Sequence, residues 1–123
     1  MAVRDPTVKV LPGGAKLVTW TGLLNGDTGA PVFLPEHGDR SVQVTGTFGV
    51  GGTCVFQGNN DDPDITPVPV NYYSLTDPAL TVISFTAAGG ETVLDPTVFV
   101  RPNVTAGDGT TSLTVRMYAR RIY

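Results

Sequence analysis

The sequence predicts an all-β protein, an antiparallel β-sandwich or jelly roll of about eight short strands. Short runs rich in β-branched and aromatic residues recur along the chain, and turn residues bound each of them. Fifteen glycines and ten prolines lie between these runs without forming a repeat. The period of an amphipathic helix is absent from the sequence. A chain of 123 residues is long enough for one domain with its own core.

Residues 1–14 are expected to form an extended N-terminal arm, ahead of a single β-sandwich domain over residues 15–123. Prolines and glycines bracket a run of strand-forming residues here. Within this run, Val8, Lys9, Val10 and Leu11 can add as a strand to the sheet edge of another protein. A terminus that is disordered, or that packs on its own domain, is an equally open alternative.

The core strands are expected in the following order. Residues 16–24 form the first strand, and a short strand over residues 30–34 follows it. Alternation then places Val42, Val44 and Phe48 on the inner face of the next strand. Further strands are expected over residues 53–57, 72–75, 80–85 and 91–94, with a long acidic, proline-rich loop over residues 58–70.

The length of the loop that precedes Cys54 can be inferred from which side chains each length would place on the inner face of the strand. A two-residue turn over residues 51–52 would point Cys54 and Phe56 outward, whereas a three-residue loop over residues 50–52 puts both on the face of Phe48. Each large apolar side chain that becomes buried contributes about 1.5–3 kcal/mol. The sequence therefore predicts a hairpin with a three-residue loop and a buried Cys54.

The last quarter of the chain predicts a second hairpin. Residues 97–104 and 111–120 both alternate apolar and polar residues, and Asp108-Gly109 lies between them. Asp-Gly is a favoured pair for a two-residue turn because both central residues take positive φ. This turn brings the apolar residues of both strands to one face. The predicted pairs are Val104–Leu113, Pro102–Val115, Val100–Met117 and Val98–Ala119.

The other face of this hairpin is expected to be basic and aromatic. Phe99 would pair with Tyr118, and Arg101 would lie opposite Arg116. Like charges that lie directly opposite destabilise a sheet, so we expect a partner protein to cover them. A base-stacking platform and an ordinary outer face with arginines over rings are the alternatives. The complete predicted interface comprises Val8, Lys9, Val10, Leu11, Phe99, Arg101, Arg116, Tyr118 and Arg120.

Charge is distributed unevenly along the chain, although the formal net charge is only −3. Residues 1–96 carry four basic and ten acidic side chains, including a cluster over residues 61–64. Residues 97–123 carry four arginines and one acid. One part of the chain can therefore attract the other part of a neighbouring copy, or an acidic protein surface. Nucleic acid is a poor expected partner, since the whole molecule repels phosphate.

The sequence offers little for catalysis. His37 is the single histidine and lies in a Pro/Gly-flanked loop, where a solvated side chain is expected. Glu36 and Glu91 lie near turns, and a hydrolase that uses them is a distant alternative. Residues 59–64 have oxygen atoms for calcium but lack the spacing of an EF-hand, so a solvated loop is expected. We therefore expect no enzyme activity, no cofactor and no metal.

Cysteine content and hydropathy further limit the classes of protein to which this chain can belong. Cys54 is the single cysteine, which rules out an internal disulfide and a cysteine-rich zinc site. No stretch approaches the roughly 18 apolar residues of a membrane span. The N-terminus lacks the apolar segment of a signal peptide, so folding in the cytoplasm is expected.

Two segments carry a resemblance to a known family. They are RSVQVTGTFGVGGT over residues 40–53, continued by FQGNN, and RPNVTAGDGTTSLTV over residues 101–115. Together they resemble small β-rich proteins of tailed bacteriophages, encoded among head genes, that are similar to capsid decoration (cement) proteins. The resemblance covers about half of the chain and implies no enzyme activity.

The expected function is that of a non-enzymatic structural virion protein. It would be assembled in the host cytoplasm, bind the outer surface of the capsid and cement neighbouring copies of the major capsid protein. A homodimer or other homo-oligomer at a capsid symmetry axis is expected. The alternative is a carbohydrate- or receptor-binding module of a phage tail, for which Tyr72 and Tyr73 are the candidate aromatic platform.

Overall fold

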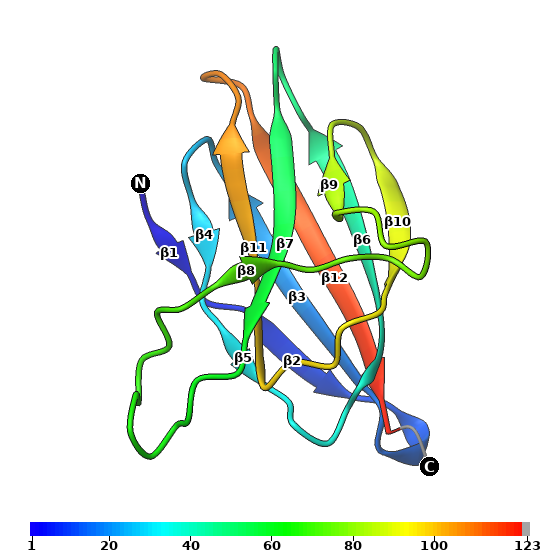
Figure 1. Cartoon of the computed structure of the whole chain (residues 1–123). Coiled ribbons are helices and arrows are strands. Elements are labelled where there is room, and N and C mark those ends of the chain that lie inside the picture. Colours follow the sequence, from blue (N-terminus) through cyan, green and yellow to red (C-terminus); the bar gives the residue numbers. More distant parts are fainter. Residues whose placement is uncertain (122–123) are drawn as a thin grey trace.

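A computed structural model describes residues 1–121 and consists of two β-sheets packed face to face (Figure 1). The predicted all-β sandwich is confirmed: the described residues contain twelve strands, one turn of 3-10 helix (Pro12–Gly14) and no α-helix. Sheet A comprises β1 (Val3–Arg4), β4 (Thr28–Gly29), β5 (Val32–Phe33), β7 (Thr53–Asn59), β8 (Tyr73–Ser74), β9 (Ser84–Phe85) and β11 (Phe99–Ala106). Sheet B comprises β2 (Thr7–Val10), β3 (Lys16–Leu23), β6 (Asp39–Thr47), β10 (Gly89–Val93) and β12 (Ser112–Arg120).

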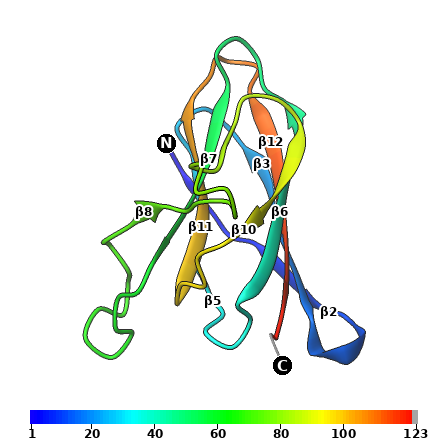
Figure 2. The ribbon, with the colours of Figure 1, turned by 45° about the vertical axis from the view of Figure 1, so that its right-hand side comes forward.

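The strand order of each sheet does not follow the chain. Sheet B has the order β10-β6-β12-β3-β2, and sheet A has the order β1-β4-β11-β7-β8, with β5 beside β11 and β9 beside β7. The two layers are seen almost edge-on in Figure 2, with β7 and β11 in one layer and β6 and β12 in the other. β1 and β4 run parallel, and the other pairings are antiparallel.

The core lies between the two sheets and is centred on Trp20, which is fully buried. Its ring meets Phe56 edge to face, with 6.4 Å between ring centroids. The indole Nε1–H donates to the Ala30 carbonyl at 3.0 Å, so the polar atom of the ring is satisfied. Gly29 packs against the same ring: a Cβ there would lie 2.6 Å from both Trp20 and Pro102.

The predicted C-terminal hairpin is wrong, because β11 belongs to sheet A and β12 to sheet B. Val104 pairs with Cys54 and Leu113 with Gly46, so the two strands do not pair with each other. The predicted inner faces are nevertheless correct, since these apolar side chains are buried. They are Val100, Pro102 and Val104 on β11 and Leu113, Val115, Met117 and Ala119 on β12. Val98, the other residue predicted for this face, precedes β11 and is only half-buried. Alternation sets which face of a strand is buried and leaves the neighbouring strand open.

The segment between β11 and β12 bridges the two sheets instead of closing a tight hairpin. Neither Asp108 nor Gly109 takes a positive φ. The Asp108 carboxylate instead accepts hydrogen bonds from the Thr110 N–H at 2.8 Å and hydroxyl at 2.7 Å, and from the Val50 N–H at 2.9 Å. These bonds lower the pKa of Asp108 to about 2. An aspartate that binds its own turn in this way is the competing use of an Asp-Gly pair.

The segment over residues 48–52 also crosses between the sheets, because β6 lies in sheet B and β7 in sheet A. The predicted hairpin at this position is therefore wrong. The prediction that Cys54 is buried is confirmed, since its side chain is 1 % exposed and lies in the core beside Phe56. Burial raises the pKa of the Cys54 thiol to about 12, so the thiol stays protonated and unreactive at neutral pH.

Residues 1–14 do not form a free extended arm. β1 pairs with β4 in sheet A, and β2 pairs with β3 in sheet B, so the terminus packs on its own domain. The Asp27 carboxylate holds the first residues in place, accepting from the Ala2 N–H at 2.8 Å and from Arg4 Nε at 3.0 Å. The self-packed alternative is the one that the structure contains, and β2 becomes an edge strand of sheet B.

Candidate protein-binding surface

The outer face of sheet B is a regular array of side chains whose order follows from the strand register. Paired residues point to the same side of a sheet, so each line of pairs forms a row across the strands. The first row comprises Thr7, Thr19, Arg116, Gln43 and Gly90. The second row comprises Lys9, Leu17, Tyr118, Ser41 and Thr92. Three residues of the predicted interface, Lys9, Arg116 and Tyr118, therefore share one surface.

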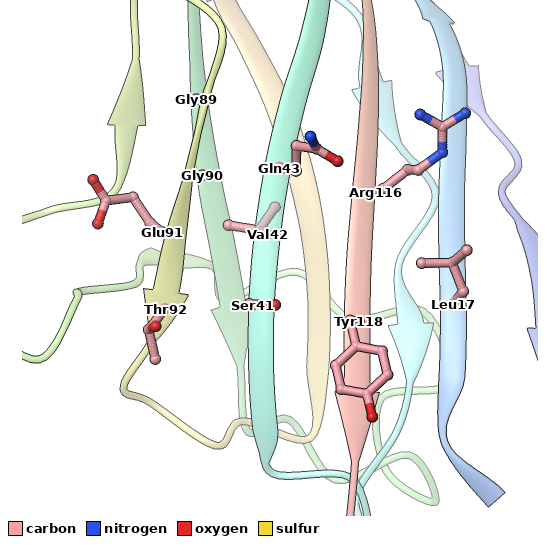
Figure 3. A pocket seen from close by; sticks show the side chains of 10 residues that line it. All are labelled: Leu17, Ser41, Val42, Gln43, Gly89, Gly90, Glu91, Thr92, Arg116 and Tyr118. Atoms are coloured by element: carbon pink, nitrogen blue, oxygen red, sulfur yellow. The ribbon is translucent and has the colours of Figure 1, made fainter. Parts of the chain in front are cut away.

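The residues of these rows, apart from Thr7, Lys9 and Thr19, line an open groove of about 590 Å³ on the sheet (Figure 3). Arg116 and Tyr118 project from β12 at its centre, with Leu17 of β3 beside them. Gly90 has no side chain, so only backbone lines the groove at this position of β10. Glu91 points away from Arg116 at the edge of β10 in Figure 3. We call this surface the sheet B groove.

The basic side chains divide sharply in how the fold uses them. Five of the eight interact with other groups of the chain: Arg4, Arg40, Arg101, Arg120 and Arg121. Lys9, Lys16 and Arg116 have no hydrogen-bond or ion-pair partner among residues 1–121, and all three lie on sheet B. Arg116 lies in the groove and Lys9 lies on the same face at the β2 edge, so this face carries two cations that the rest of the described chain leaves unpaired.

Phe99 and Arg101 lie on the opposite surface of the molecule, the outer face of sheet A. The predicted patch that joined them to Tyr118 and Arg116 is therefore wrong, for the same reason as the hairpin. The Arg101 guanidinium lies 3.6 Å from the centroid of the Tyr72 ring, and its Nε donates to Gln57 Oε1 at 3.0 Å. Phe99 is only 6 % exposed, and its ring centroid lies 5.3 Å from that of Phe33. The fold therefore buries the Phe99 ring and half-buries Arg101, whose guanidinium has partners within the chain.

Arg120, the last residue of the predicted patch, lies at the end of β12. It forms an ion pair with Asp39, its cross-strand partner on β6. This pair lies in solvent and contributes little to stability. It does, however, remove the unpaired charge that the sequence suggested at Arg120.

β2 presents the second part of the predicted interface at the edge of sheet B. Val8 and Val10 are 49 % and 67 % exposed, and within the described residues no strand pairs with the outer edge of β2. Leu11 ends the strand by donating its N–H to the Ala15 carbonyl at 2.7 Å. Pro6 precedes β2 and the strand is short, two features that restrict such an edge to short partner strands.

His37 and Arg40 form a buried polar cluster that was not predicted. His37 is 5 % exposed, so the predicted solvated histidine is wrong; its Nε2–H donates to the Gly14 carbonyl at 3.1 Å. Arg40 is 2 % exposed and donates to the carbonyls of Leu34 at 2.8 Å, His37 at 2.6 Å and Thr97 at 2.8 Å. Burial lowers its pKa to about 10, so the side chain stays charged at neutral pH.

The acidic loop, residues 60–72, is closed by one of its own carboxylates. Asp61 accepts hydrogen bonds from Asn71 Nδ2 at 2.9 Å, the Val70 N–H at 2.8 Å and the Asn71 N–H at 3.1 Å. These bonds lower the pKa of Asp61. In the part of the chain that the structure describes, no three His, Cys, Asp or Glu side chains are grouped to hold a metal ion. Among the same residues, no helix has the length and apolar composition to cross a membrane.

Comparison with known proteins gives a match of fold. No protein-family model and no curated protein sequence matches the chain. The crystal structure of the SPBc2 prophage-derived protein YomS is similar, with a TM-score of 0.61 and 12 % sequence identity. The match covers 90 % of this chain and 98 % of that chain. The chain therefore shares the fold of this prophage-derived protein over nearly its whole length.

Proposed function

We propose that the protein is a non-enzymatic structural component of a phage particle. In this proposal it binds the outer surface of the capsid and cements neighbouring copies of the major capsid protein. The observation that carries the proposal is the outer face of sheet B. Arg116 and the exposed ring of Tyr118 lie in the sheet B groove, and Lys9 lies on the same face at the β2 edge. Neither cation has a hydrogen-bond or ion-pair partner among residues 1–121. The resemblance of two segments to capsid decoration proteins and the fold shared with a prophage-derived protein support the phage assignment.

The chemistry of the groove suits a protein partner. Tyr and Arg are enriched in protein interfaces, where they supply most of the binding energy. An acidic partner surface would supply the ion pair that residues 1–121 do not give Arg116, and complementary charge speeds association. At the adjoining edge, Val8, Lys9, Val10 and Leu11 can add to a short strand of the capsid protein.

In this proposal, the protein stabilises the capsid because many copies each link neighbouring capsid subunits. In this proposal the protein is a homo-oligomer at a capsid symmetry axis, added to the particle in the host cytoplasm. Each copy then joins two or more capsid subunits through modest contacts. When several such contacts are linked, the apparent affinity exceeds that of any one of them by orders of magnitude.

Several candidate residues for other functions are occupied by the fold, whereas Tyr73 and Glu91 remain exposed. The His37 ring is buried against a carbonyl, and Glu36 forms an ion pair with Arg121 at 3.1 Å. Tyr72, a candidate for stacking on a sugar, carries the Arg101 guanidinium over its ring. These contacts favour protein binding over catalysis and over the tail ligand-binding alternative.

The test is the occupancy of purified protein on particles that lack it. We expect Arg116→Glu to lower the affinity roughly tenfold or more, since each 1.4 kcal/mol of binding energy is tenfold. Arg101→Glu is the matched control, with the same charge change on the other face, and should bind like the wild type. Wild-type occupancy of the Arg116→Glu variant would overturn the proposal.

A further inference from the structure

We propose that residues 62–70 of one copy dock in the sheet B groove of a second copy, head to tail. The inference names the loop of a neighbouring copy as the occupant of the groove and leaves the adjoining β2 edge to the capsid protein. It rests on the proposed function of sheet B in protein binding. It uses a second feature of the molecule, the acidic loop, which that function leaves unexplained.

The acidic loop displays apolar side chains that the core does not use. Ile65, Val68 and Val70 are 79 %, 73 % and 66 % exposed. Exposed apolar side chains gathered on one segment mark an interaction surface more often than isolated ones do. Because the Asp61 carboxylate binds the Val70 and Asn71 N–H groups, these residues are presented on a closed loop.

The conformation of this segment is set in advance by proline. Residues 67–70 read Pro-Val-Pro-Val, and each proline fixes its own φ and restricts the residue before it. The chain bends at Pro67 and Val68. A segment restricted in this way loses little conformational entropy when it binds an apolar or aromatic groove. Tyr118 and Leu17 provide such a floor in the sheet B groove.

The charges of loop and groove are complementary. Asp62 and Asp64 precede the apolar part of the loop, are exposed, and have no cationic partner within residues 1–121. Lys9 and Arg116 are separated by two strand spacings and two residues, so their Cα atoms lie roughly 12 Å apart. A segment that runs from the groove toward β2 can place a carboxylate near each cation.

The positions of loop and groove require two copies. In Figure 2 the acidic loop extends on the sheet A side, whereas β6, β12 and β2 lie on the other side. The loop therefore cannot reach the groove of its own chain. Since the contact joins two different surfaces, it is heterologous, and repeated contacts build a ring or an open chain larger than a dimer.

Two variants isolate the two surfaces. The groove variant is Arg116→Ser/Tyr118→Ser, and the loop variant is Asp62→Lys/Asp64→Lys. All four side chains are exposed, so both variants should keep the thermal midpoint of the wild type. Reversal of two exposed acids outside the loop, Asp5→Lys/Glu36→Lys, controls for net charge.

Sedimentation velocity of the purified proteins at low salt is the measurement. We expect the wild type and the charge control to form species larger than a dimer as concentration rises, and salt to weaken them. Each surface variant alone should be monomeric. An equal mixture should form dimers and nothing larger, because only the loop of the groove variant and the groove of the loop variant remain intact.

Three results would overturn the inference: a monomeric wild type at all concentrations, a loop variant that associates like the wild type, or a mixture that stays monomeric. These outcomes are distinct from failure of the proposed function. A monomeric protein whose Arg116→Glu variant still loses particle occupancy refutes the head-to-tail contact alone. A protein that assembles through the loop but never binds particles refutes capsid binding alone.

Discussion

The outer faces of the two sheets carry similar residues with different fates. β11 has Phe99 and Arg101 on its outer face, and β12 has Arg116 and Tyr118, in each case an arginine and an aromatic residue two positions apart. On sheet A the fold covers both side chains, with Tyr72 against the guanidinium and Phe33 against the ring. On sheet B both side chains remain exposed.

The difference arises from the neighbours on adjacent strands. Sheet A receives Phe33 from β5, and Tyr72 at the end of the acidic loop, so large side chains reach the outer face of β11. On sheet B the neighbours of Arg116 are Thr19 and Gln43. A motif of arginine and aromatic residues therefore does not define an interface by itself; the topology decides whether the chain covers the motif or leaves it to a partner.

Arg40 extends the comparison to a fully buried arginine and should show the largest effect. Arg40→Met removes the donor for three buried carbonyls, and each unsatisfied group costs about 1–3 kcal/mol, partly offset by loss of a buried charge. We expect the free energy of unfolding to fall by about 3 kcal/mol in urea denaturation. Arg40→Lys keeps the charge but has fewer donors, so its free energy of unfolding should lie between those of the wild type and Arg40→Met. If Arg40→Met left the free energy of unfolding unchanged, these hydrogen bonds would not contribute to the stability of the fold.

The two outer arginines should differ in their contribution to stability. Arg101→Ala loses a stacking contact worth about 0.5–1 kcal/mol and a hydrogen bond worth about 1 kcal/mol. Arg116→Ala loses no hydrogen bond or ion pair within the described chain and should change the free energy of unfolding by less than about 0.5 kcal/mol. Equal losses for the two variants in urea denaturation would contradict the comparison.

The smallest predicted effect is that of acid on the contacts of Asp27 with the N-terminal strand, which should weaken before the centre of sheet B does. Burial alone would raise the pKa of Asp27, but hydrogen bonds from Leu24, Arg4 and Ala2 outweigh it and hold the pKa below 3.8. A carboxyl with a lowered pKa in the folded state stabilises the protein fully above pH 3.8, and this contribution is lost as pH falls through the folded value. Amide hydrogen exchange should therefore show protection of Ala2 and Leu24 falling in acid before that of β12.

Asp27→Asn is the control for this prediction. The variant lacks the titrating group, so exchange at Ala2 and Leu24 should be fast at every pH after correction for intrinsic rates. If the wild type kept full protection of these amides at pH 2, the link between Asp27 and the N-terminal strand would be disproved.

The sequence predicted the fold class and the buried faces because both follow from local alternation. Each inward residue of β11 and β12 was identified correctly, and so was the burial of Cys54. The neighbouring strands were not predicted, since two apolar faces can meet side by side in one sheet or across a core. The Asp108-Gly109 pair misled because the Asp108 carboxylate binds Thr110 and Val50 instead of allowing a tight turn.

The candidate site was predicted in part for the same reason. Lys9, Arg116 and Tyr118 share one surface because β2, β3 and β12 are adjacent, which no local pattern reveals. A signal for buried Arg40 was present, since it has the parity of Val42 and Val44 on β6. The single histidine gave no such signal, because His37 is buried by a contact with Gly14, far away in the sequence.

The central claim is that a second polypeptide covers the outer face of sheet B but not that of sheet A. Tyr118 on sheet B and Tyr73 on sheet A are a matched pair, 39 % and 45 % exposed. Hydroxyl-radical oxidation of both rings, in the dilute purified protein and in assembled phage particles, tests the claim directly. We predict similar oxidation of the two in the free protein and selective protection of Tyr118 in the particle. Oxidation of Tyr118 in the particle at the rate seen in free protein would contradict the account.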